Sequence, residues 1–137
     1  MRLMCLDVGT KRIGIAVSDL LMITAQGVET LYRTSVEKDV KRYKELIEQY
    51  GVDKIIIGLP KNMNGTIGPM AQSVMDYAES IREELGLPIE FYDERLSTKL
   101  ATDTLINGNV SRQKRKNYVD MVAASYILQS YMDSIKK

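Results

Sequence analysis

The sequence contains no histidine, one cysteine and almost no net charge. The lack of histidine excludes a serine–histidine catalytic triad and every histidine-ligated zinc site, so acid–base or metal chemistry must use carboxylates, lysine, tyrosine or water. The one cysteine, Cys5, cannot form an internal disulfide, and its place in an apolar segment favours a buried, inert thiol. A net charge of +1 attracts nucleic acid weakly, so a local basic patch would have to hold such a partner.

Long hydrophobic runs are also missing. No apolar stretch approaches the length of a bilayer span. The N-terminus lacks the basic start, apolar middle and small-residue cleavage site of a signal peptide. We therefore expect a cytoplasmic protein without a membrane partner. The composition, 45% hydrophobic and 27% charged over 137 residues, suits a single globular domain over residues 1–137.

The order of predicted elements is that of an α/β protein. Five segments have the composition of strands, and a turn at residues 9–12 joins the first two as a hairpin. Apolar residues at helical spacing mark the helices, two of which end at Gly51 and Gly86. The predicted strands are 2–8, 12–18, 26–33, 53–60 and 87–92. The predicted helices are 36–50, 70–85, a short one from Ser97 to about Asn107, and 118–135.

This order predicts a five-stranded mixed sheet, a three-strand antiparallel meander plus two parallel strands, with helices on both faces. The first strand should lie centrally, beside the strand at 53–60, with Asp7 at its C-terminal end. An ionised carboxylate is costly to bury, so Asp7 there would need a cation, a proton or a metal. The alternative for Asp7 is a turn-capping side chain before Gly9.

Two further acidic segments could join Asp7. Asp93 and Glu94 directly follow the last strand, where the alternative is an exposed acidic turn. Asp120 should point inward, although the helix dipole also favours an acid in the first turn of a helix. Three carboxylates at one sheet edge would offer oxygen ligands, which suit Mg²⁺ or Mn²⁺ and phosphodiester cleavage. The packed helix face that Asp120 shares is formed by Ala123, Ala124, Ile127 and Tyr131.

Four segments of the chain resemble one protein family. They are "DVGTKRIGIAVSD", "GLPKNMNGTIGPMA", "DERLST" and "VDMVAASYILQSY". In this order, and over nearly the whole chain, they resemble the bacterial YqgF/RuvX family of Holliday junction resolvases and pre-16S ribosomal RNA nucleases. The resemblance implies an RNase H-like fold, with Asp7, Glu94 and Asp120 as the catalytic and metal-binding acids and Asp93 as the alternative to Glu94.

The function that this resemblance implies is that of a divalent-metal-dependent endonuclease. Its reaction would be 5′ processing of pre-16S ribosomal RNA or resolution of Holliday junctions, with Mg²⁺ or Mn²⁺ as cofactor. Structured or precursor RNA and branched DNA both stay open as the nucleic-acid partner. Monomer and homodimer stay open as the oligomeric state.

Basic and glycine-rich segments predict contacts with phosphates. The loop at 61–69 precedes the N-terminus of a helix, where backbone amides can bind a phosphate. We therefore favour phosphate binding over the alternative, a flexible connection without a ligand. A basic run directly precedes the helix that carries Asp120. It predicts contact with phosphates near the site, and the alternative is a charged surface that contacts only solvent. The candidate nucleic-acid-binding residues are Lys11, Arg12, Asn64, Gly65, Arg95, Arg112, Lys114, Arg115 and Lys116.

Two other functions fit parts of the pattern. "DVGTKRIG" also resembles the first phosphate motif of the sugar-kinase and actin group, which are ATP-binding proteins of a related fold. Those proteins need two such domains around the nucleotide, and 137 residues could supply them only through a dimer. The other alternative is a non-catalytic module that binds RNA, the ribosome or a transcription partner. It predicts binding that survives loss of the acids.

Overall fold

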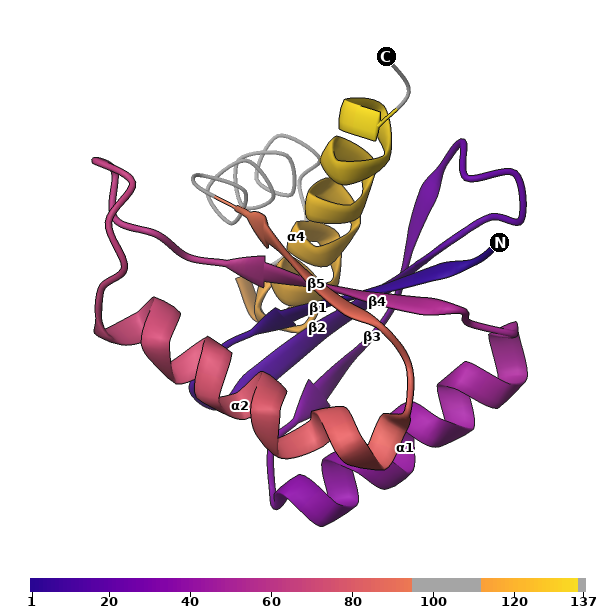
Figure 1. The fold of residues 1–137 in the computed structure, drawn as a ribbon, viewed down its shortest axis with the longest axis horizontal. Coiled ribbons are helices and arrows are strands. Elements are labelled where there is room, and N and C mark those ends of the chain that lie inside the picture. The colour runs from indigo at the N-terminus through magenta and orange to yellow at the C-terminus, as the bar shows by residue number, and fades with distance from the viewer. Residues whose placement is uncertain (95–111, 136–137) are drawn as a thin grey trace.

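Five strands form one mixed sheet. The structure, a computed structural model, describes residues 1–94 and 112–135 of the chain. The strand order is β3-β2-β1-β4-β5, so β1 is central (Figure 1). β2 is antiparallel to β1 and β3, whereas β4 is parallel to β1 and β5, which confirms the predicted meander with two parallel strands. The strands are β1 Leu3–Val8, β2 Arg12–Ser18, β3 Ala25–Tyr32, β4 Lys54–Leu59 and β5 Ile89–Asp93.

Helices cover both faces of the sheet. α1 (Val36–Tyr50) and α2 (Pro69–Leu85) lie side by side on one face, and α4 (Arg112–Ile135) packs on the other (Figure 1). α1 begins after Ser35, whose side chain accepts a hydrogen bond from a backbone amide of the first turn, and it ends at Gly51 in the left-handed conformation. Within the described ranges, no helix is both long and apolar enough to cross a bilayer.

The last helix is longer than predicted. We expected it to begin at residue 118, after a polar and basic segment at 109–117, but α4 already includes Arg112. Arginine, glutamine and lysine are good helix formers, so they extend the helix beyond the part with apolar periodicity. The short helix predicted from Ser97 lies outside the described residues. The other boundaries agree with the predicted ones or differ from them by at most two residues.

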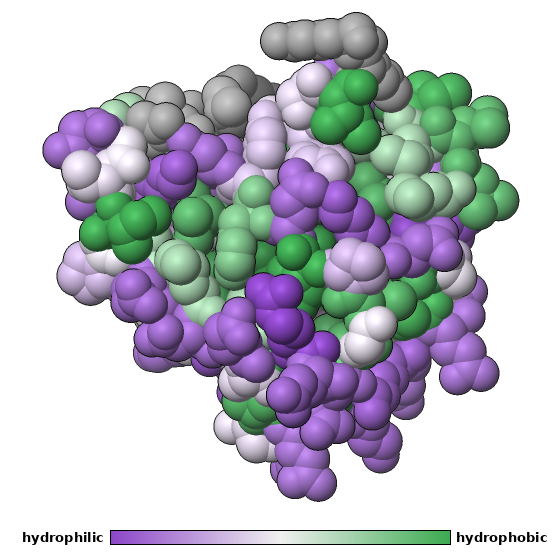
Figure 2. Space-filling model, viewed as in Figure 1, coloured by the Kyte–Doolittle hydropathy of each residue, from purple (hydrophilic) through white to green (hydrophobic). Residues whose placement is uncertain are grey.

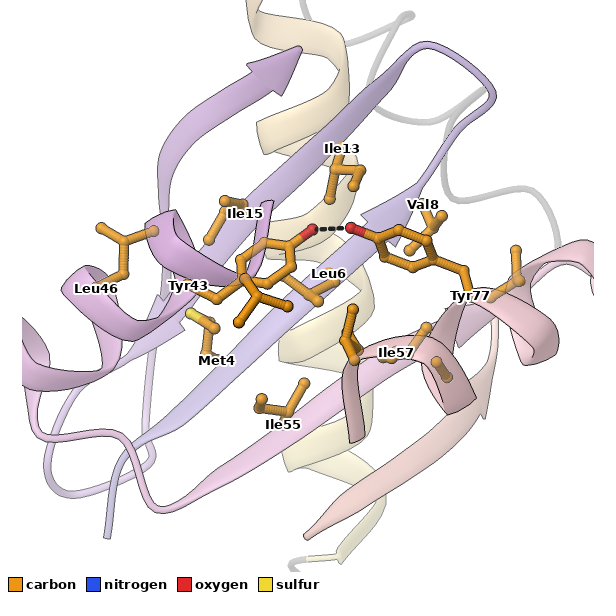
Figure 3. Packing of buried hydrophobic residues seen from close by; sticks show 14 of the residues in the cluster. Met4, Leu6, Val8, Ile13, Ile15, Tyr43, Leu46, Ile55, Ile57 and Tyr77 are labelled. Atoms are coloured by element: carbon orange, nitrogen blue, oxygen red, sulfur yellow. Dashed lines mark hydrogen bonds between the residues drawn. The ribbon is translucent and has the colours of Figure 1, made fainter. Parts of the chain in front are cut away.

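The side chains of β1 alternate between two hydrophobic cores. Leu6 and Val8 face α1 and α2, as Figure 3 shows, whereas Leu3 and Cys5 pack towards α4. A strand covered on both faces in this way is buried along its whole length. Because side chains alternate with a period of two, Asp7 lies on the α4 face at the C-terminal end of the strand. The buried, unbridged state expected of Cys5 is confirmed.

The inward face of α4 has the predicted composition. Its small residues let the helix approach the sheet closely, and its larger ones complete the second core with Leu3 and Ile56. Asp120 occupies the same face, one turn before these residues, so its side chain is carried towards the sheet. The buried residues of this face are Ala123, Ala124, Ile127 and Tyr131.

Exposed hydrophobic side chains gather at the β2–β3 connection, at the end of β2 opposite the turn at residues 9–12. Figure 2 shows this hydrophobic surface at the upper right, where Figure 1 places the connection. Within it, the Asp19 carboxylate accepts hydrogen bonds from the amides of Ile23 and Thr24, at 2.7 and 3.0 Å, and so closes the turn. The exposed residues are Leu20, Leu21 and Ile23.

Candidate active site

A pocket of about 530 Å³ lies at the C-terminal end of β1. It brings together Asp7 of β1, Glu94 after β5 and Asp120 of α4. Parallel strands end at the same edge of a sheet, which explains why the ends of β1 and β5 deliver their acids to one place. The remaining lining residues are Val8, Gly9, Thr10, Lys11, Arg12, Tyr32, Pro60 and Met70.

Asp7 and Glu94 form a carboxyl pair joined by a side-chain hydrogen bond. Burial raises the pKa of Asp7 to about 6, the hydrogen bond from Glu94 opposes the rise, and the charge of Asp120 adds to it. Burial also raises the pKa of Glu94 to about 9, and the charge of Asp7 adds to this rise. Two carboxylates that share a site cannot both ionise easily. The pair therefore holds one shared proton at neutral pH.

Gly58 of β4 makes room for the Glu94 side chain. A Cβ at Gly58 would stand 2.6 Å from Glu94 Oε2 and 2.9 Å from Ile127 Cδ1. The Glu94 amide donates to the Leu59 carbonyl at 3.3 Å, which holds the residue beside the end of β4. Oε2 is buried and has no hydrogen-bond partner among the described residues. A buried carboxylate oxygen without a donor is open to a cation.

Asp120 is paired with Arg12, the first residue of β2. Arg12 Nε lies 2.9 Å from Asp120 Oδ2, so the two side chains form an ion pair at the pocket wall. Burial raises the pKa of Asp120, and the Arg12 guanidinium opposes that rise. The ion pair thus offsets part of the effect of burial on this half-buried carboxyl group.

The three acids do not form one compact metal-binding group. Within residues 1–94 and 118–135, no three acidic or cysteine side chains lie close enough together to hold an ion. Asp7 and Glu94 form a close pair, and Asp120 lines the same pocket and is paired with Arg12. The joint role of the three acids in holding a metal stays a prediction. The pair nevertheless fits a hard divalent cation, since its donors are all oxygens and an ion could replace the shared proton.

The predicted phosphate contacts fall into four groups. Lys11 and Arg12 line the pocket. Asn64 and Gly65 are not among the residues that line it, and the Asn64 side chain accepts a hydrogen bond from the Thr66 amide at 3.1 Å within its own loop. Arg95 lies outside the described residues. The four residues of the basic run, Arg112, Lys114, Arg115 and Lys116, belong to α4 and precede Asp120.

Some residues that shape the pocket were missed from the sequence. Gly14 and Gly58 lie inside strands, where glycine often marks the close approach of another chain segment, and this signal could have identified both. Tyr32 and Met70 line the pocket, but no local pattern distinguishes them from other surface residues. Their role at the site follows from the fold alone.

Sequence comparison connects the chain to one family. A family model described as "RuvX: Holliday junction resolvase" matches residues 1–134. A protein of Clostridioides difficile (strain 630) named "Putative pre-16S rRNA nuclease" is 52% identical over 132 residues, covering 96% of this chain and 94% of that protein. A protein of the same name from Moorella thermoacetica is 48% identical over 135 residues, covering 98% of this chain and 96% of that protein.

Solved structures with a similar fold include two resolvases. RuvC of T. thermophilus in complex with a Holliday junction substrate has a TM-score of 0.59 at 15% identity and covers 98% of this chain and 94% of that chain. The Fowlpox virus resolvase in complex with Holliday junction DNA has a TM-score of 0.60 at 14% identity, with full coverage of both chains. At these identities the likeness establishes the fold, which is RNase H-like as expected.

Proposed function

Since the chain belongs to the RuvX family of Holliday junction resolvases, a nuclease family of RNase H-like fold, we propose that it is a divalent-metal-dependent endonuclease. Its substrate class is nucleic acid. The observation that carries the proposal is the buried pair of Asp7 and Glu94, which shares a proton at the end of the parallel strands. A carboxyl pair held against its own charge repulsion is suited to bind a cation.

Nucleases of this fold generally depend on divalent metal ions, and the residues present fit one. Asp7 and Glu94 would hold it, and Asp120 would add negative charge from the α4 side. A bound divalent ion supplies charge stabilisation at the phosphate and an activated water. On binding, Asp7 and Glu94 release the proton that they share. Mg²⁺ and Mn²⁺ are the ions that we propose, because the donors are all oxygens.

The remaining site residues act on the substrate side of the pocket. Lys11 and Arg12 are placed to contact phosphates of the nucleic-acid backbone, which orient the strand without selecting a sequence. Arg12 also holds Asp120 at 2.9 Å. Glu94, and not Asp93, is the second carboxylate in this proposal, because Glu94 lines the pocket and shares the proton with Asp7.

The substrate we propose is the precursor of 16S ribosomal RNA, cut during 5′ processing. Relatives at 52% and 48% identity carry this activity in their names, whereas the junction resolvases with solved structures share 15% identity or less and support the fold alone. A four-way DNA junction is the alternative substrate.

The ATP-binding alternative loses its support, since the family model covers nearly the whole chain. The cytoplasmic location and the choice between monomer and homodimer stay predictions.

A cleavage assay tests the function. Purified protein is incubated with a pre-16S RNA fragment and, separately, with a four-way DNA junction, in Mn²⁺ and in EDTA. We expect RNA cleavage in Mn²⁺ only, abolished in Asp7→Asn and Glu94→Gln and retained in the matched variant Asp93→Asn. Cleavage in excess EDTA would contradict the metal dependence. Binding without cleavage, unchanged in the acid variants, would support the non-catalytic module.

Thermal melting tests the metal site without relying on activity. A ligand that binds only the folded state raises its stability by about 2.7 kcal/mol at 100 times its dissociation constant. We expect Mn²⁺ to raise the melting temperature of the wild type and to have little effect on Asp7→Asn. Asp133→Asn, an exposed acid of α4, serves as the control and should respond as the wild type does. Equal shifts in all three proteins would show that Asp7 holds no ion.

A further inference from the structure

The turn that follows Asp7 is bound by Arg33, which lies in the connection between β3 and α1. Its side-chain Nη1 donates to the Gly9 carbonyl at 2.8 Å. Its backbone amide donates to the Lys11 carbonyl at 2.9 Å. The turn itself is closed by the Gly9 amide, which donates to the Arg12 carbonyl at 2.8 Å. Arg33 therefore binds two carbonyls of a turn that supplies Lys11 and Arg12 to the pocket.

The guanidinium of Arg33 is itself fixed from the α1 and α2 side. It lies 4.5 Å from the centre of the Tyr77 ring, a cation–π contact. The Tyr77 hydroxyl donates to Asp39 Oδ2 at 2.8 Å, and the Tyr43 hydroxyl lies 2.7 Å from that of Tyr77. Because Tyr77 gives its proton to Asp39, Tyr43 donates to Tyr77. Figure 3 shows the two hydroxyls meeting above the central strands.

Asp39 is the buried acidic residue at the end of this series of contacts. The residue is 2% exposed and lies in the first turn of α1, where the helix dipole favours a carboxylate. Its Oδ1 has no hydrogen-bond partner among the described residues. Arg33, which lies against the ring of Tyr77, brings a positive charge to this cluster. Its charge opposes the rise that burial causes in the pKa of both Tyr43 and Tyr77.

We propose that Arg33 is a positioning residue for the active-site turn Gly9–Arg12, held in place by Tyr77 and the buried Asp39. A rigid turn keeps Arg12 on Asp120 and points Lys11 at the substrate. Loss of the Arg33 side chain leaves the Gly9 carbonyl without its donor and removes the cation from the face of the Tyr77 ring. This inference rests on the proposed function in one respect only, the assignment of the turn to the active site.

The first test distinguishes an effect of Arg33 on the position of the turn from an effect on RNA binding. Arg33→Met removes the donor but keeps the length of the side chain, and Arg33→Lys keeps the charge and a donor. We expect kcat of Arg33→Met to fall roughly 10- to 100-fold, as for a small misplacement of reacting groups. We expect the dissociation constant for pre-16S RNA in EDTA to change less than about twofold, since the phosphate-binding charges of the turn remain. Arg33→Lys should recover most of kcat. The control is Arg42→Met, which removes an α1 arginine paired with Glu29 of β3 and Glu45 of α1 and should retain the wild-type kcat.

The second test needs no activity. Trypsin cuts after lysine and arginine, so a loosened turn exposes the bonds after Lys11 and Arg12. Mass spectrometry should detect cleavage there several-fold faster in Arg33→Met than in the wild type or Arg42→Met. Wild-type rates of proteolysis together with a wild-type kcat would overturn the proposal. If the wild type itself cleaves no nucleic acid in Mn²⁺, the proposed function fails, and proteolysis still decides the role of Arg33.

A matched pair of tyrosine variants covers the case in which Arg33→Met does not fold. Tyr77→Phe removes the hydroxyl that binds Asp39, whereas Tyr43→Phe removes a neighbouring hydroxyl and leaves the bond between Tyr77 and Asp39 intact. Below the melting temperature of both, we expect faster trypsin cleavage at the turn in Tyr77→Phe only. Equal cleavage in the two variants would show that Asp39 and Tyr77 do not hold the turn.

Discussion

Gly14 of β2 lies directly under the backbone of Asp120. A Cβ at position 14 would stand 1.8 Å from the Asp120 carbonyl oxygen, so no other residue fits without moving α4 or the sheet. Gly14 is also the partner of Asp7 in the β1–β2 register. Gly14 thus sets the distance between α4 and the strands β1 and β2. That distance determines where Asp120 lies relative to Asp7.

Replacing Gly14 should therefore disturb both stability and the site. We expect Gly14→Ala to lower the free energy of unfolding by about 2 to 3 kcal/mol, the range of an overpacked core. Gly27→Ala is the matched control, because a Cβ there would stand 3.1 Å from the Met121 carbonyl oxygen and needs only a small adjustment. Urea denaturation of both variants gives the comparison. A Gly14→Ala variant as stable as Gly27→Ala would contradict the close approach.

The carboxyl pair predicts how stability depends on pH without metal. Asp7 and Glu94 have higher pKa values in the folded chain than the usual values near 4, so the native state binds more protons than the unfolded state. In EDTA, the free energy of unfolding should fall as pH rises from about 4 through 9. Glu94→Gln cannot ionise and should exceed the wild type at pH 8 by about 1 to 2 kcal/mol.

Glu90→Gln is the matched control for this experiment. A hydrogen bond from Lys54 lowers the pKa of Glu90, so its charge supports the fold above the usual carboxyl pKa and its support is lost as pH falls. Glu90→Gln should therefore be less stable than the wild type at pH 8, the opposite of Glu94→Gln. Urea denaturation at pH 5 and pH 8 measures both. A Glu94→Gln variant that unfolds more easily than the wild type in EDTA would show that ionisation of the pair does not destabilise the fold.

The ion pair between Arg12 and Asp120 should be measurable by a double-mutant cycle. Arg12 is partly exposed and Asp120 is more buried, so we expect a coupling energy of about 1 kcal/mol between Arg12→Met and Asp120→Asn at neutral pH. The removal of Arg12 alone should raise the pKa of Asp120 further, since the guanidinium opposes the effect of burial. Additive effects of the two substitutions would mean that the contact does not stabilise the protein.

The basic run at the start of α4 predicts a salt effect on binding. Replacing Arg112, Lys114, Arg115 and Lys116 together by alanine should flatten the plot of log affinity against log salt. Each lost phosphate contact should lower the slope by roughly 0.7 to 0.9. The control removes Lys38, Lys41 and Lys44 of α1, on the opposite face of the sheet, and should leave the slope unchanged. Fluorescence anisotropy with labelled RNA in EDTA, at several salt concentrations, measures it.

The sequence by itself determined the meander with two parallel strands, the central place of β1 and the inward face of α4. The first two follow from the order of the elements and the rules for connecting them. The third follows from local periodicity: helical spacing puts Asp120 with Ala123 and Ala124, as a period of two directs alternate side chains of β1 to opposite faces. The position of Asp7 at a buried strand end was predictable for the same reason. The resemblance of four motifs added Glu94 and the nuclease function, which the family match then supported.

Only the tertiary structure decided how these acids are paired. Whether Glu94 reaches Asp7 depends on the room left by Gly58, and whether Asp120 joins them depends on Gly14 and on Arg12. Arg33 carries no local pattern that connects it with the turn it holds. Distances between segments far apart in the chain are set by packing and by charge balance across the whole fold, and a local pattern contains neither.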